Sequence, residues 1–68
     1  MRNWLIAIRK ARGLTQIQLA DAVGMSPSYI ALIETGERKV PVWTAKKIAA
    51  ALGFNWQRFY EDEKETTK

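Results

Sequence analysis

The 68-residue sequence predicts an all-α fold, a compact bundle of five short helices. Apolar residues recur at spacings of three and four along most of the chain, which favours helices over strands. Four glycines each follow such an apolar run, where a helix C-terminus favours a residue with positive φ. The expected helices cover residues 2–12, 15–23, 26–34, 42–52 and 55–60. Residues 1–60 are thus expected to form one domain, and residues 61–68 a flexible polar tail.

Helix start signals support this order. Thr15 is followed three residues later by Gln18, which is the capping-box pattern of a helix N-terminus. Ser26 precedes Pro27, and a serine cap followed by proline at the first helical position is a second such signal. Asn55 provides a cap for the last helix.

The apolar spacing also predicts which side chains form the core. A chain of this length buries only about 60% of the surface that it exposes when unfolded, so tight helix packing or dimerisation must stabilise it. The expected core residues are Leu5, Ile8, Ile17, Leu19, Ala20, Val23, Ile30, Ile33, Val42, Ala45, Ile48, Ala49, Leu52, Phe54 and Phe59.

The composition excludes several kinds of site. The chain has no Cys and no His, which rules out disulfides, the usual zinc ligands, a cysteine nucleophile and the commonest general base. We therefore expect no enzyme activity, no metal and no cofactor. No apolar stretch is long enough to cross a bilayer, so we expect no membrane association. A chain without cysteine also suits the reducing cytoplasm.

The charge is unevenly distributed and predicts an anionic partner. Residues 1–47 contain eight basic and three acidic side chains, whereas residues 48–68 contain three basic and four acidic ones. Nucleic acid is the commonest partner of such a basic body.

The segment 16–33 predicts two helices that cross at a steep angle. Only Gly24 and Met25 separate the first helical pattern from the serine cap of the second, and Gly24 tolerates the positive φ of so tight a turn. A close crossing requires a small residue, and Ala20 is placed there. Such an arrangement leaves the outer face of the second helix free to enter a DNA major groove.

At this point the sequence resembles the Cro/C1-type helix-turn-helix family of phage repressors and their bacterial relatives. The resemblance covers about residues 4–60. It implies a transcriptional regulator, a repressor that binds double-stranded DNA at a pseudo-palindromic operator as a homodimer. The residues that carry it are Leu14, Thr15, Gln16, Leu19, Ala20, Val23, Gly24, Met25, Ser26, Ile30, Ile33, Glu34, Thr35 and Gly36.

The resemblance also implies roles for individual positions. An ion pair between Arg9 and Glu34 would join the first and third helices. The outward positions of the recognition helix, which would contact bases, are Pro27, Ser28, Ala31 and Leu32. The positions expected at phosphates are Gln16, Tyr29, Thr35, Arg38 and Lys39, the last three in the loop after that helix.

These outward positions depart from the family pattern. Direct readout of bases commonly uses amide or guanidinium groups, which bond adenine or guanine in pairs. Here only Ser28 offers a side-chain hydrogen bond, whereas Leu32 offers apolar contact to thymine methyl groups. We expect modest direct readout, a T-rich component in the site and some dependence on DNA shape.

The aromatic residues near the C-terminus suggest a dimer interface at Trp43, Trp56 and Tyr60, with packing inside one protomer as the alternative. Within the DNA-binding class, an antitoxin or a restriction-modification controller would show the same pattern. A protein-interaction module that has lost DNA binding is the competing class. No small-molecule ligand is expected.

Overall fold

A computed structural model describes residues 1–61, and it is all-helical over that range, as predicted. A shorter helical segment, residues 58–61, follows the four main helices, and in residues 1–61 no helix is long and apolar enough to cross a membrane. The tail predicted from residue 61 lies outside the described residues from 62 onward, and Glu61 is still helical. The main helices are α1 (Asn3–Ala11), α2 (Gln16–Val23), α3 (Pro27–Thr35) and α4 (Val42–Leu52).

The helix starts follow the sequence signals. Thr15 Oγ1 accepts a hydrogen bond from the Gln18 N–H at 3.1 Å, and Gln18 Oε1 accepts one from the Thr15 N–H at 2.9 Å, so the capping box is confirmed. Ser26 Oγ caps α3 by accepting from the N–H of Tyr29 at 3.1 Å. Asn55 Oδ1 accepts from the Gln57 N–H at 2.9 Å, as a cap does, and a turn at 56–57 then leads into the last helical segment, which begins at 58 rather than 55.

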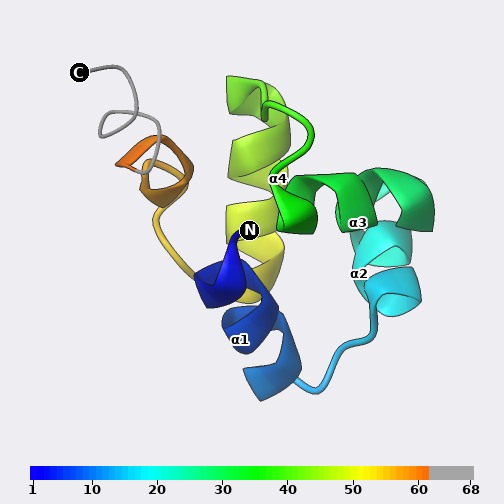
Figure 1. The fold of residues 1–68 in the computed structure, drawn as a ribbon. Helices are drawn as coiled ribbons and strands as arrows, with labels where there is room; N and C mark the ends of the chain where they lie inside the picture. The colour runs from blue at the N-terminus through cyan, green and yellow to red at the C-terminus, as the bar shows by residue number, and fades with distance from the viewer. Residues whose placement is uncertain (62–68) are drawn as a thin grey trace.

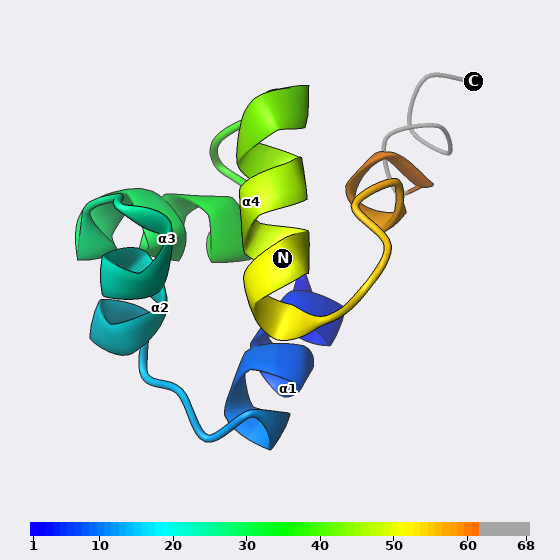
Figure 2. The same cartoon turned by 180° about the vertical axis from the view of Figure 1, so that it is seen from behind.

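The helices pack around α4. In Figures 1 and 2, α2 and α3 lie on one side of α4, the segment 58–61 lies on the other, and α1 lies near the C-terminal end of α4. The N-terminus meets the end of α3, where the backbone N–H of Arg2 donates to the Glu34 carbonyl at 2.7 Å. The N-terminal end of the chain therefore contacts a helix end that lies about 30 residues away in the sequence.

The core combines aliphatic side chains from all four helices with an aromatic cluster. Trp4 packs edge-on against Phe54 and Phe59, with ring centroids 5.3 and 5.2 Å away. Phe59 is fully buried, whereas Phe54 is half-buried. Arg58 lies over the Trp4 ring, 4.8 Å from its centroid. The buried apolar residues are Leu5, Leu19, Ala20, Val23, Ile30, Ile33, Val40, Ala45, Ile48, Ala49, Leu52 and Phe59.

Two residues were wrongly predicted to be in the core. Ile17 is 68% exposed and Val42 is 47% exposed. At 100° per residue, Ile17 lies about 110° from the centre of the buried stripe of α2, and Val42 about 90° from that of α4. Both residues also lie in the first turn of their helix, where fewer neighbours are available to cover them.

Candidate nucleic-acid interface

The turn between α2 and α3 is short and fixed by backbone bonds. Gly24 has a left-handed conformation, with φ of 72°, and its N–H donates to the Asp21 carbonyl at 3.3 Å. The Met25 N–H donates to the Ala20 carbonyl at 2.8 Å. Ala20 is 1% exposed, so the two helices meet at a side chain small enough for close approach. Met25 and Ser26 alone connect Gly24 to α3, which fixes the direction in which α3 leaves α2.

Helix α3 has a buried face and an outer face. Ile30, Ile33 and Glu34 are buried. At 100° per residue, the face opposite this stripe is centred between Ser28 and Leu32. Ser28 is exposed and Leu32 is half-buried. The outer face therefore presents one hydroxyl and one apolar side chain in its middle.

The other predicted contact positions of α3 lie around this face. Pro27 is exposed at the first helical position, and Ala31 is half-buried. Tyr29 is half-buried and packs against the core, which places it at the flank of the helix. Thr35 is the last residue of α3 rather than part of the following loop, and its exposed hydroxyl donates to the Leu32 carbonyl at 3.1 Å.

A buried ionic network holds the C-terminal end of α3. Arg9 Nε donates to Glu34 Oε2 at 2.7 Å, and Arg9 Nη1 donates to the Leu14 carbonyl at 2.8 Å. Gln16 Nε2 donates to Glu34 Oε1 at 2.9 Å. The Glu34 residue is 1% exposed, so its charge depends on these donors in place of water. The network joins α1, the start of α2 and the end of α3 into one frame.

Three arginines of the basic body act within the fold, and two of these roles were not predicted from the sequence. Arg2 Nη1 donates to the Ile33 carbonyl at 2.7 Å, and its guanidinium lies 5.7 Å from the Phe59 ring centroid. Arg12 Nε donates to the Leu52 carbonyl at 2.6 Å, at the C-terminal end of α4. Arg9 is paired with Glu34 and Arg2 is buried, so a partner has little access to either, whereas Arg12 remains exposed.

Arg38 and Lys39 lie in the loop that follows α3, and both are exposed. The backbone N–H groups of Glu37 and Arg38 donate to the Leu32 carbonyl at 3.0 and 3.4 Å, which ties the loop to α3. The exposed side chains of Arg38 and Lys39 are thereby held beside the C-terminal end of α3.

The aromatic residues predicted for a dimer interface differ in exposure. Trp43 is 61% exposed on α4. Trp56 and Tyr60 are half-buried, with ring centroids 6.0 Å apart in an edge-to-face arrangement. Lys46 lies over the Trp56 ring, 5.2 Å from its centroid, and the Tyr60 hydroxyl donates to the Val40 carbonyl. Trp56 and Tyr60 therefore have contacts within the protomer in addition to any with a partner.

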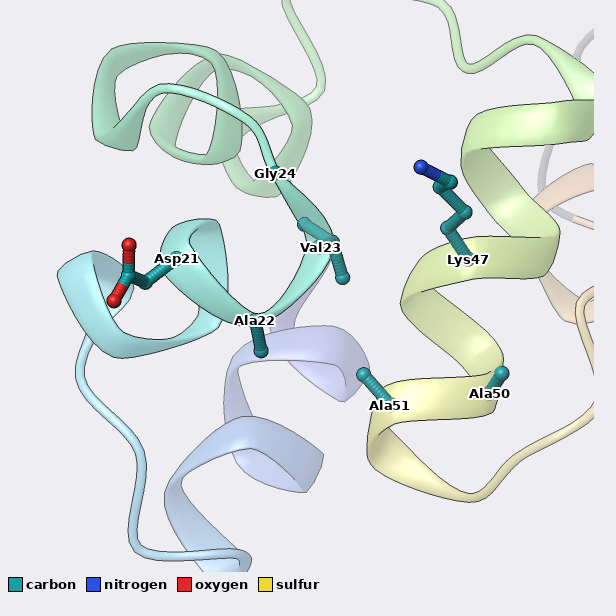
Figure 3. A pocket seen from close by; sticks show the side chains of 7 residues that line it. All are labelled: Asp21, Ala22, Val23, Gly24, Lys47, Ala50 and Ala51. Atoms are coloured by element: carbon teal, nitrogen blue, oxygen red, sulfur yellow. The ribbon is translucent and has the colours of Figure 1, made fainter.

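A groove lies between α4 and the C-terminal end of α2, and Gly24 of the turn forms part of its lining (Figure 3). It is lined mainly by small side chains, Ala22, Ala50 and Ala51. In Figure 3, Lys47 extends from α4 alongside the turn, whereas Asp21 points away from α4. In residues 1–61, no group of three or more acidic side chains has a geometry that could hold a metal ion.

The short turn, the braced α3 and the neighbouring cations define a helix-turn-helix domain. A helix-turn-helix family model matches residues 5–59 of the chain. The chain is 43% identical, over its full length and 90% of the relative, to an uncharacterized HTH-type transcriptional regulator, YqaF, of Bacillus subtilis strain 168. It is 47% identical over 47 residues to the immunity repressor protein of Bacillus phage phi105; that match covers 69% of the chain and 33% of the repressor. The chain belongs to the Cro/C1-type helix-turn-helix family of DNA-binding transcription regulators.

Proposed function

We propose that the protein is a sequence-specific repressor that binds a pseudo-palindromic operator as a homodimer. In this proposal α3 enters the major groove of each half-site, and the two half-sites lie about one helical turn, roughly 34 Å, apart. Pro27, Ser28, Ala31 and Leu32 would face the bases. Gln16, Tyr29, Thr35, Arg38 and Lys39 would contact phosphates, which supply most of the affinity and fix the register.

The proposal rests mainly on one observation: contacts at both ends of α3 fix its position, and two exposed cations lie beside it. Gly24 fixes the direction of α3 at its start, and the Glu34 network holds its end. On the outer face between these supports Ser28 is exposed and Leu32 half-buried, and the exposed Arg38 and Lys39 lie at one end. A helix that is already fixed in position loses little conformational freedom on binding. When it enters the groove, the adjacent cations can contact the phosphates at the same time.

The dimer is the second part of the proposal. Trp43 is a large apolar side chain exposed on α4, and the half-buried Trp56 packs against α4 under the ammonium group of Lys46. A second copy of the chain would cover these rings. The named relative, the phage immunity repressor, supports a repressive role, although the matched part is one third of that protein.

In-vitro selection from random DNA duplexes tests the function. The proposal predicts that an inverted repeat with T-rich half-sites is enriched and that its binding weakens steeply with salt. An enriched single half-site without symmetry would contradict the dimer and leave DNA recognition standing.

A protein-interaction module is the second candidate, because three of the four outward positions of α3 are Pro27, Ala31 and Leu32, which make no directional contacts with bases. This candidate predicts that no sequence is enriched. It also predicts that a protein partner captured from the host still binds when Arg38 and Lys39 are changed to Gln.

A further inference from the structure

The loop that presents Arg38 and Lys39 is fixed at both of its ends. At its start, the N–H groups of Glu37 and Arg38 donate to the Leu32 carbonyl. At its end, the Val40 side chain is 3% exposed in the core, and its carbonyl accepts a hydrogen bond from the Tyr60 hydroxyl. The two exposed cations lie between these attachments, so their position depends on both.

The attachment at Val40 comes from a distant part of the chain. Tyr60 belongs to the segment 58–61, which lies across α4 from α3 (Figure 1). Its ring packs edge-to-face with Trp56, and Trp56 in turn lies under the Lys46 ammonium group. A phenol ring that is half-buried between such neighbours has few rotamers, so its hydroxyl is aimed at one place.

From this geometry we infer that Tyr60 is a positioning residue for DNA binding, whose hydroxyl holds the loop 36–41 so that Arg38 and Lys39 meet the phosphates. The inference rests on the proposed DNA-binding function and adds a role to it. Tyr60 acts through the loop and makes no contact with DNA itself. The segment 58–61 is thereby coupled to the DNA surface, so a partner that moves this segment alters the affinity for DNA, and DNA alters the affinity for that partner.

The substitution Tyr60→Phe isolates the hydroxyl, because it keeps the ring and its packing against Trp56. Gln57→Ala is the matched control, since Gln57 is exposed on the same segment and lines the same surface groove as Tyr60. The background variant is Arg38→Gln/Lys39→Gln, which keeps the loop but removes the charges that Tyr60 is proposed to place.

The experiment measures binding to a mixed-sequence duplex of about 30 base pairs, roughly three helical turns, at low salt by fluorescence anisotropy. Such a probe contains no chosen operator and reports phosphate contacts. Circular dichroism first establishes a temperature at which every variant is folded. We expect Tyr60→Phe to weaken binding by about three- to tenfold, because the free loop then occupies its binding position for a smaller fraction of the time and one hydrogen bond sets the upper limit of that change. Gln57→Ala should leave binding unchanged.

The double-mutant cycle decides whether Tyr60 acts through the loop. In the Arg38→Gln/Lys39→Gln background, Tyr60→Phe is expected to change binding by less than about twofold, because the charges it positions are gone. An equal loss in both backgrounds, or no loss in the wild-type background, would overturn the inference. A wild-type protein that does not bind the duplex at low salt would instead contradict the proposed DNA-binding function.

Discussion

The substitution Arg9→Met tests whether the buried network holds the fold together. Met keeps much of the length of the side chain but removes all the donors that Glu34 receives from Arg9. Glu34 is 1% exposed, and its remaining donor from a side chain is Gln16 at 2.9 Å. Removing one partner of a buried ion pair costs about 3 to 5 kcal/mol, because the other charge stays buried without compensation.

This loss is large for a chain of this size. At about 0.05 to 0.15 kcal/mol per residue, the free energy of unfolding of a domain of 68 residues is roughly 3 to 10 kcal/mol. A loss of about 3 kcal/mol corresponds to a fall in melting temperature of roughly 12 to 24 °C. Arg9→Met should therefore lower the melting temperature by this amount and, at the low end of the stability range, leave the protein partly unfolded near room temperature.

Urea denaturation followed by circular dichroism provides the measurement. Lys10→Met is the matched control, because Lys10 is the exposed basic neighbour of Arg9 on the same helix. The double variant Arg9→Met/Glu34→Leu should recover most of the lost stability, since it removes both charges together. A loss of less than about 1 kcal/mol in Arg9→Met, or a double variant less stable than Arg9→Met, would refute the reasoning.

Three further predictions concern the turn, the outer face of α3 and the dimer. Gly24→Ala should lower the free energy of unfolding by about 1 kcal/mol because φ is positive there, and Gly24→Asn should lower it less; since space around Gly24 is open, equal losses in urea melts would argue against backbone strain as the cause. Leu32→Ala should keep the fold and weaken the preference at one base pair by about 1 kcal/mol or less, and a large fall in melting temperature would place Leu32 in the core instead. Trp43→Ala should keep the melting temperature, because Trp43 is 61% exposed, but shift sedimentation at micromolar concentration toward the monomer; an unchanged profile would remove Trp43 from the interface.

The features that the sequence predicted well are local. The capping box at Thr15, the serine cap at Ser26 and the positive φ of Gly24 depend on residues within three positions of each other, so their pattern is visible in the sequence. The buried stripe of α3 was also predicted, because Ile30 and Ile33 are three residues apart and so lie on one face of a helix.

The features that were missed depend on distant parts of the chain. Arg2 and Arg12 donate to backbone carbonyls 31 and 40 residues away. Every residue has a backbone carbonyl, so the residue type at the acceptor position gives no sign of such a bond. The exposure of Ile17 depends on which side of α2 the other helices cover, and spacing alone leaves a margin of about one quarter turn. The hydrogen bond between Tyr60 and Val40 likewise required the fold, since the aromatic pattern indicated only a surface for a partner.

For the site, the sequence predicted the ion pair that braces α3 but not the bonds from two other arginines to backbone carbonyls. Arg9 was predicted to pair with Glu34, and the structure places it 2.7 Å from that carboxylate. Arg2 and Arg12 are also engaged inside the fold, so the cations beside α3 are mainly Arg38 and Lys39.

The salt dependence of DNA binding tests the central claim most directly. The slope of log binding constant against log salt concentration reports how many phosphates the protein neutralises. The account predicts that Arg38→Gln/Lys39→Gln reduces the magnitude of this slope by about 2, whereas Lys10→Gln, which removes an exposed charge on α1, leaves it nearly unchanged. Equal slopes for the wild type and the Arg38→Gln/Lys39→Gln variant would contradict the claim that this loop and α3 form the DNA interface.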